Sequence, residues 1–206
     1  MKKVAVLIDG GFLSKIFKKK RKEHIKANNI LALAEKIIKE NEEIFRIYYY
    51  DAPPFDKILK NPIDDSKFDY SQTPLCKAIN CFHIDLAEKK FIALRKGKLS
   101  FSGWKLTENA IKKIREGKAT GIKAPDITPD FKQKAVDMKI GLDIAWFATK
   151  RIVDKIVLVT ADNDFIPAMK FARKEGIHIA IAKIERLNSE MLQHSDEIIE
   201  IDITLI

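Results

Sequence analysis

Val4-Ala5-Val6-Leu7-Ile8-Asp9-Gly10-Gly11 is the stretch that decides the fold. Five apolar residues, rich in β-branched side chains and closed by an aspartate and two glycines, are typical of a strand buried on both faces of a parallel sheet. In open α/β sheets the ligand crevice lies beyond the carboxyl ends of the strands. The stretch therefore predicts a central strand with a functional carboxylate, Asp9, at its end.

Helical and strand patterns alternate along the rest of the chain. Apolar residues at steps of three and four predict helices over residues 29–40 and 133–150. Apolar runs predict strands at residues 44–50, 155–160 and 177–182, and a short helix and a last strand are expected near 187–193 and 197–201. Such alternation indicates an α/β fold with a mostly parallel sheet flanked by helices.

The middle of the chain breaks this alternation. Prolines frame a polar excursion over residues 52–73, and a helix is predicted at 73–88 and another at 107–116. Lys96-Gly97-Lys98 reads as the turn of a β-hairpin between residues 91–95 and 99–101, and residues 117–131 as a mobile loop. We expect one domain over residues 1–206 with an inserted β-hairpin region at roughly 52–130.

The composition bounds the class of protein. A net charge of +9 and a pI near 9.4 favour polyanionic partners such as nucleic acid or anionic membrane, and charge alone does not name which. No apolar segment is long enough for a membrane span or a signal core, so we expect a cytoplasmic protein without membrane association. Two cysteines do not make a disulfide framework, and the sequence leaves monomer and homo-oligomer both open.

Aspartates follow two of the predicted strands. Asp162 and Asp164 come directly after the strand at 155–160, so a parallel sheet would bring them to the same edge as Asp9. Carboxylates held close together either share protons or bind a cation, and hard oxygen ligands suit Mg²⁺ or Mn²⁺. The alternative is structural: Asp9 starts a turn and Asp164 caps the helix that follows.

The helix predicted at residues 133–150 adds two more aspartates. Asp137 lies near its start, where a helix meets the strand ends, whereas Asp143 is six residues further and points to a different side. We therefore expect Asp137 in the site and Asp143 behind it or on the surface. Lys134 could pair with phosphate or stay solvated, and Thr160 and Asn163 could orient ligands or serve ordinary turn and cap roles.

Four motifs, in the expected order, resemble those of the NYN domain family, the PIN-like bacterial proteins of the LabA kind. They are Val6-Leu7-Ile8-Asp9-Gly10-Gly11, Tyr49-Tyr50-Asp51-Ala52-Pro53, Phe131 to Asp137 with Leu142-Asp143, and Thr160-Ala161-Asp162-Asn163-Asp164-Phe165-Ile166-Pro167.

The resemblance implies a PIN-like fold and an Mg²⁺- or Mn²⁺-dependent ribonuclease. It implies a catalytic set of Asp9, Asp137, Asp162 and Asp164, with the first three as metal ligands. Metal ions held there would polarise the scissile phosphate and activate water. The chain carries Gly11 where many relatives carry asparagine and Ala161 at a common glycine, which leaves open a non-catalytic nucleic-acid- or protein-binding module of the same fold.

Basic and aromatic residues offer a surface for RNA. The candidates for phosphate contact or base stacking are Lys19, Lys20, Arg21, Arg95, Lys96, Lys98 and Trp104. The alternative is that the aromatic rings pack the inserted region and the charges are solvated. The spacing of Cys76, Cys81 and His83 does not suit a four-ligand zinc site, and neither an aspartyl phosphatase nor a dinucleotide-binding motif is present.

Overall fold

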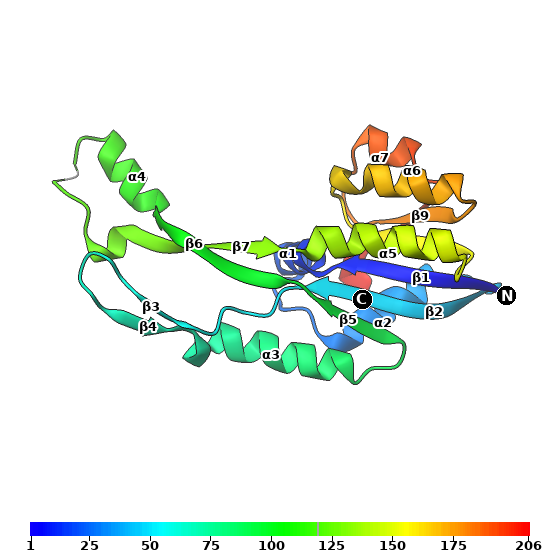
Figure 1. Cartoon of the computed structure of the whole chain (residues 1–206), viewed down its shortest axis with the longest axis horizontal. Helices are drawn as coiled ribbons and strands as arrows, with labels where there is room; N and C mark the ends of the chain where they lie inside the picture. The colour runs from blue at the N-terminus through cyan, green and yellow to red at the C-terminus, as the bar shows by residue number, and fades with distance from the viewer. Residues whose placement is uncertain (119) are drawn as a thin grey trace. The chain divides into compact units, whose positions relative to one another are not determined.

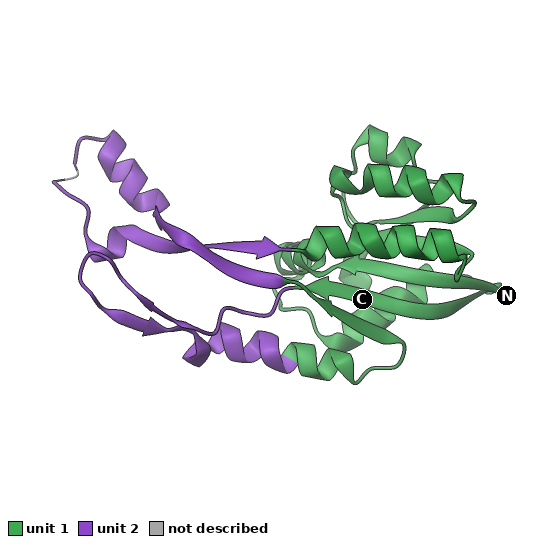
Figure 2. Ribbon diagram, in the orientation of Figure 1, with its two compact units in different colours: residues 1–51, 82–97, 135–206 green, residues 52–81, 98–134 purple. Residues whose placement is uncertain are grey.

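The computed structural model describes residues 1–118 and 120–206; Ala119, part of the predicted loop at 117–131, lies outside the described residues. The chain divides into two compact units (Figure 2). Unit 1 contains residues 1–51, 82–97 and 135–206, and unit 2 contains residues 52–81 and 98–134. The region predicted as an insertion therefore includes a segment, 82–97, that belongs to unit 1.

Unit 1 is built on a six-stranded sheet with the order β10-β9-β8-β1-β2-β5, and every neighbouring pair is parallel. Figure 1 labels β9, β1, β2 and β5 of this sheet. The strands are β1 (Lys2–Asp9), β2 (Glu42–Asp51), β5 (Ile92–Lys96), β8 (Lys155–Val159), β9 (His178–Lys183) and β10 (Glu197–Glu200). The predicted α/β class with a parallel, helix-covered sheet is confirmed.

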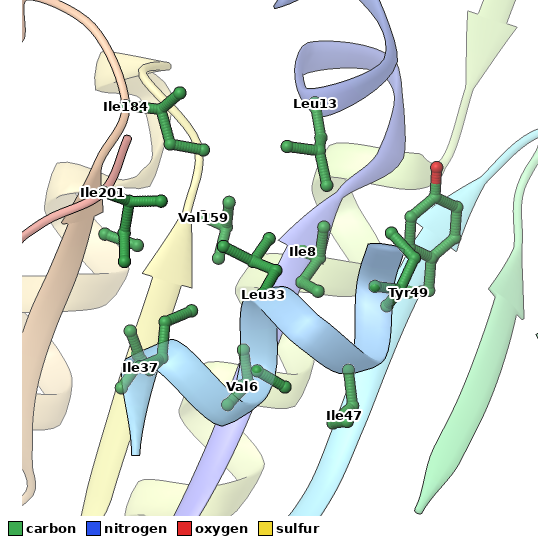
Figure 3. Close-up of a cluster of buried hydrophobic side chains, with 14 of the residues drawn as sticks. Val6, Ile8, Leu13, Leu33, Ile37, Ile47, Tyr49, Val159, Ile184 and Ile201 are labelled. Carbon is green, nitrogen blue, oxygen red and sulfur yellow. The ribbon is translucent and has the colours of Figure 1, made fainter. Parts of the chain in front are cut away.

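Helices cover both faces of this sheet, and β1 shows why its sequence is continuously apolar. Val4, Val6 and Ile8 face α1 (Gly10–Arg21) and α2 (Ala27–Ile37), as Figure 3 shows for part of this cluster. Ala5 and Leu7 face the opposite layer, formed by α5 (Val136–Lys150), α6 (Ile166–Lys174) and α7 (Ser189–Gln193). Full burial of one such aliphatic side chain stabilises the fold by about 1.5–3 kcal/mol.

The order of the strands indicates which edge of the sheet would bind a ligand. From β1 the chain moves outward to β2 and then β5, and it returns to the other side of β1 with β8, β9 and β10. The winding direction thus reverses between β1 and β8. In doubly wound sheets ligands bind beyond the carboxyl ends of the strands at such a switch point. Asp9 ends β1 and Asp162 follows β8, so both predicted aspartates lie at this edge.

Unit 2 contains two antiparallel pairs, β3 (Ile58–Lys60) with β4 (Lys67–Asp69) and β6 (Lys98–Leu106) with β7 (Ile127–Lys134). Its helices are α4 (Glu108–Arg115), which Thr107 caps, and the first part of α3 (Pro74–Ala87).

The hairpin predicted around Lys96-Gly97-Lys98 is wrong. Residues 92–96 form β5, which pairs with β2 in the main sheet, and Gly97 donates a backbone hydrogen bond to the Asp51 carbonyl (2.7 Å). The strand that follows, β6, pairs instead with β7. The turn was predicted from neighbouring residues, whereas β5 and β6 each pair with a strand that lies far away in the sequence.

Two further boundaries differ from the prediction. Residues 127–131, the last part of the loop predicted at 117–131, belong to β7; both strands of a two-stranded sheet are edges, where a proline such as Pro129 is tolerated. The helix predicted from residue 133 begins at Val136, because Gln133 and Lys134 continue β7 and Ala135 turns the chain with φ +65°.

Candidate functional site

Asp9 is held where β1 passes into α1. It is the N-cap of α1, and its Oδ1 accepts a hydrogen bond from the Phe12 backbone N–H (3.1 Å). The next residue must be small, because a Cβ added to Gly10 would lie 2.7 Å from the Tyr49 ring and from the Tyr50 carbonyl oxygen. The helix therefore starts in close contact with β2, and this contact fixes the position of Asp9.

Thr160 connects the ends of β1 and β8. Its side chain is buried, and its hydroxyl donates to Asp9 Oδ2 (3.3 Å) while accepting from the Asp162 backbone N–H (3.2 Å). The sequence assigned Thr160 either a ligand-orienting or a turn role; the structure gives it a bridge between two acidic loops. One hydroxyl thus sets the spacing of Asp9 and the Asp162 turn.

Asp162 begins a short 3₁₀ turn, Asn163–Phe165. Its Oδ1 accepts from the Asp164 backbone N–H (2.9 Å), so the capping residue is Asp162 and not Asp164, to which the structural alternative gave that role. Asn163 and Asp164 are exposed, while Phe165 is buried and anchors the turn. Among the described residues, Asp162 Oδ2 and both carboxylate oxygens of Asp164 accept no hydrogen bond.

Asp137 enters from the first turn of α5 and is exposed. Partial desolvation and the neighbouring charges of Asp162 and Asp164 raise its pKa. Burial also raises the pKa of Asp9, and Asp137 adds to that rise, although hydrogen bonds from Phe12 and Thr160 oppose it. The structure therefore brings four predicted acids, from three separate segments, into electrostatic contact.

None of the described Lys and Arg side chains relieves this repulsion by an ion pair. Within residues 1–118 and 120–206, none of the ion pairs involves Asp9, Asp137, Asp162 or Asp164, and the pKa of Asp9 and Asp137 is shifted by carboxylates without any opposing Lys or Arg. We refer to these four residues as the aspartate cluster.

The aspartate cluster is more open than a closed metal-binding set. Among the described residues, no three His, Cys, Asp or Glu side chains are placed to hold one ion together. Mg²⁺ in phosphoryl-transfer sites is commonly held by only one or two carboxylates, with water and substrate phosphates completing its shell. The donor set of the aspartate cluster fits that open mode of binding.

Asp143 lies away from the aspartate cluster. It is buried and accepts hydrogen bonds from the Tyr50 hydroxyl (2.8 Å) and from Arg95 Nε and Nη2 (3.0 and 2.6 Å). This bidentate pair ties α5 to β2 and β5, and it raises the pKa of Arg95 through the hydrogen bonds to Asp143. Arg95, a candidate for RNA contact, is thus engaged within unit 1.

The other basic candidates differ in their surroundings. Lys20 Nζ donates to the Ile184 carbonyl (2.8 Å), and the Arg21 guanidinium lies over the Phe17 ring at 5.0 Å. Trp104 is half-buried and packs edge-on against Phe101, with ring centroids 5.7 Å apart. The remaining candidates are exposed: Lys19, Lys96, Lys98 and Lys134.

Sequence reasoning considered His83 only as a zinc candidate and did not predict its contact with Asp51. It is buried on α3, and its Nε2 lies 2.9 Å from Asp51 Oδ2 at the carboxyl end of β2. Its Nδ1 has no hydrogen-bond partner among the described residues. A histidine within the apolar pattern of a helix was the only signal in the sequence.

A parallel sheet flanked by helices, with acids at its switch point, is consistent with a PIN-like fold. The family model of the NYN domain matches residues 96–202, more than half of the chain, and the chain belongs to this family. The match contains Asp137, Asp162 and Asp164, whereas Asp9 precedes it.

A solved structure gives the same view of the fold. The chain resembles a protein of unknown function from Vibrio parahaemolyticus, with a TM-score of 0.54 and 15% identity over 98% of this chain and 93% of that one. No curated protein matches the sequence. In the part of the chain that the structure describes, no helix combines the length and apolar character needed to cross a membrane.

Proposed function

We propose that the protein is a cytoplasmic ribonuclease that hydrolyses RNA phosphodiester bonds with the help of Mg²⁺ or Mn²⁺. The observation that carries this proposal is the aspartate cluster: acids from β1, α5 and the turn after β8 lie at the carboxyl end of the sheet, and the described residues form no ion pair with them. Besides burial, Asp137 raises the pKa of Asp9, and Asp162 and Asp164 raise that of Asp137. Membership of the NYN domain family supports a nuclease fold.

Asp9, Asp137 and Asp162 would hold the metal, with Asp164 as the fourth acid. A bound divalent ion would polarise the scissile phosphate, lower the pKa of a coordinated water and stabilise the leaving oxygen. The chain's own residues position these groups: the Thr160 hydroxyl holds Asp9 and the Asp162 turn together, and the α1 N-terminus orients Asp9. No protein nucleophile is needed.

The charge of the molecule suits a polyanionic substrate. The net charge of +9 persists although the site itself is acidic, so the basic residues lie elsewhere on the chain. Lys and Arg contacts to phosphates supply most of the affinity of proteins for single strands and make it dependent on salt. RNA would thus be bound by the basic surface and cleaved where the metal neutralises the acids.

The test is cleavage of single-stranded RNA by the purified protein in Mg²⁺, Mn²⁺ or EDTA. Loss of an outer-shell partner costs a metal enzyme roughly 10- to 100-fold in activity. Asp162→Asn changes a proposed metal ligand itself, so it should reduce cleavage by more than this. Asp85→Asn, the same change at an exposed position on α3, is the matched control and should cleave like the wild type. Cleavage that persists in EDTA, or that survives in Asp162→Asn, would rule out this mechanism.

The alternative is a binding module of the same fold that no longer cuts. The substitutions at Gly11 and Ala161, beside Asp9 and Asp162, are the features that favour it. RNA binding that is tight in both Mg²⁺ and Mn²⁺ but leaves the RNA intact would replace the ribonuclease proposal with this one.

A further inference from the structure

Unit 2 buries very little apolar surface for its size. Among its described residues, the apolar side chains that are fully buried are small: Ala52, Cys76 and Ala110. Larger ones are exposed, including Ile58 and Phe68, which expose 60% and 53% of their surfaces. Contiguous exposed apolar surface on a folded unit marks a place where something binds.

The rings of unit 2 gather into one cluster. Phe55 lies with its centroid 4.7 Å from Phe131, 5.6 Å from Tyr70 and 6.4 Å from Phe101. All four rings are half-buried, so each packs on its neighbours and still presents part of its surface to solvent. Packing of this kind fixes the orientation of a ring before any ligand arrives.

A groove runs beside this cluster, between residues 53–59 and the start of β6. It encloses about 500 Å³ and is lined on its apolar side by Pro53, Pro54, Phe55 and Phe101. Two cations, Lys57 and Lys98, also line it; both are exposed, and neither forms an ion pair within the described residues. Asp56 is the one acid on its wall. We call this the Phe55–Phe101 groove.

The charge of unit 2 is concentrated on one of its two segments. Residues 98–134 contain nine Lys and Arg against four Asp and Glu, a net charge of +5, whereas residues 52–81 contain four of each. Two copies of such a unit would repel one another, which argues against self-association as the reason for the exposed apolar surface. A polyanion that also carries flat apolar groups is complementary to it.

We propose that the Phe55–Phe101 groove binds single-stranded nucleic acid, with a base against the Phe55 and Phe101 rings and phosphates at Lys57 and Lys98. Paired bases expose no face to a protein ring, so this chemistry selects unpaired nucleotides. The inference deepens the proposed function, since the strand held here would be the substrate of the aspartate cluster, but binding itself requires no cleavage.

The test measures binding separately from cleavage. A fluorescent, unstructured single-stranded RNA is titrated with the full-length Asp162→Asn protein in EDTA, and fluorescence anisotropy reports the dissociation constant over a range of salt concentrations. The stacking variant is Phe101→Leu, with Phe68→Leu as its matched control, because Phe68 is an exposed ring of the same unit outside the groove. The charge variant is Lys57→Gln with Lys98→Gln, and its control is Lys77→Gln on α3.

Phe101→Leu should weaken binding about 5- to 100-fold, the range for loss of one stacked base. The Lys57→Gln and Lys98→Gln double variant should weaken RNA binding further. It should also make the logarithm of the affinity fall less steeply with the logarithm of the salt concentration, by about 0.7 for each phosphate that the protein no longer neutralises. Asp56→Asn should tighten binding, and the controls should bind like the parent. A circular-dichroism spectrum and a melting curve check that each variant is folded. If Phe101→Leu is unfolded, the salt dependence of RNA binding by the lysine double variant tests the proposal instead.

Groove variants that bind like their controls would overturn the inference. So would light scattering that shows dimers abolished by Phe101→Leu, because a second copy would then be the occupant. The two proposals fail separately: groove-dependent binding without cleavage by the wild type removes only the nuclease, whereas cleavage with groove-independent binding removes only the groove.

Discussion

The two ends of the parallel sheet in unit 1 both gather charges, but they do so in opposite ways. At the amino end Lys155, the first residue of β8, is buried and donates to Glu42 Oε1 (2.8 Å) and Glu197 Oε2 (2.9 Å). Lys39 adds a third ion pair at 2.7 Å to Glu197. At the carboxyl end the aspartate cluster has no such partner within the described residues.

The pKa values record this difference. Burial of Glu197 would raise its pKa, but hydrogen bonds from Lys39 and Lys155 outweigh burial and lower it to about 2. Burial and neighbouring carboxylates raise the pKa of Asp9 and Asp137. Where the chain supplies its own cation, acids hold strands together; where it does not, the proposed metal ion would be the cation that balances them.

The largest expected effect comes from removing the lysine that pairs the two glutamates at the amino end of the sheet. Lys155→Met removes the shared cation and leaves two carboxylates close together, one of them buried, so the free energy of unfolding should fall by about 3–5 kcal/mol. Urea unfolding measures the loss. Lys150→Met, on the exposed last turn of α5, is the control and should stay within about 0.5 kcal/mol. A loss as small as the control's would show that this cluster does not stabilise the sheet.

Gly10→Ala tests how tightly the carboxyl end is built. Its Cβ would meet the Tyr50 carbonyl oxygen at 2.7 Å, a backbone atom that moves only with β2, so unfolding should become easier by about 1–3 kcal/mol. Gly141→Ala is the matched control, because nothing lies within 4 Å of its added Cβ and alanine favours a helix interior by about 0.5–1 kcal/mol. Equal behaviour of the two variants would refute the close contact of α1 with β2.

Glu197→Gln should remove the acid-sensitive part of the stability that Glu197 contributes at the amino end of the sheet. Because the pKa of Glu197 is lowered from 4.5 to about 2 in the folded protein, its contribution to stability is complete above 4.5 and is lost as pH falls toward 2. The wild type should therefore be more stable than the variant at neutral pH, and the gap should close over that interval. Thermal melting at a series of pH values checks this; a gap that is constant with pH would contradict the lowered pKa.

The smallest effect concerns the turn that leads to Asp137. Ala135 has φ +65°, and a left-handed conformation costs a residue with a Cβ about 1–2 kcal/mol, partly offset in glycine by its greater freedom when unfolded. Ala135→Gly should therefore raise the free energy of unfolding by up to about 1 kcal/mol. Ala145→Gly inside α5 should lower it by a similar amount. If both variants are destabilised alike, Ala135 is not strained.

Sequence reasoning located the aspartate cluster because its signals are local. An apolar run followed by an acid marks the end of a buried strand wherever the strand pairs, so Asp9, Asp162 and Asp164 could be assigned to one edge without the sheet order. Thr160 could be named as a candidate, but its bridge to Asp9 depends on β1 and β8 being neighbours, which 151 residues of sequence separation conceal.

The errors came where the partner is distant. The pattern around Lys96-Gly97-Lys98 fits a hairpin, yet β5 gains more by extending the main sheet beside β2. Helix geometry predicted that Asp143 lies behind the site or on the surface, but its hydrogen bonds to Arg95 and Tyr50 could not be predicted from spacing.

The most direct test of the central claim is the melting temperature of the wild type and of Asp9→Asn in EDTA and in millimolar Mn²⁺. A cation that binds only the folded protein stabilises it by about 2.7 kcal/mol at 100 times its dissociation constant, which for a chain of this size corresponds to a rise of several degrees. Asparagine can still cap α1, so the variant stays folded. Glu42→Gln, at the amino end, is the control that should keep the full response to Mn²⁺.

The expected result is a clear rise with Mn²⁺ for the wild type and little or none for Asp9→Asn. In EDTA at neutral pH the variant should be at least as stable as the wild type, since the raised pKa of Asp9 means that its ionised form costs stability there. Equal Mn²⁺ responses of the wild type and Asp9→Asn, or none in the wild type, would contradict a metal site at the switch point of the sheet.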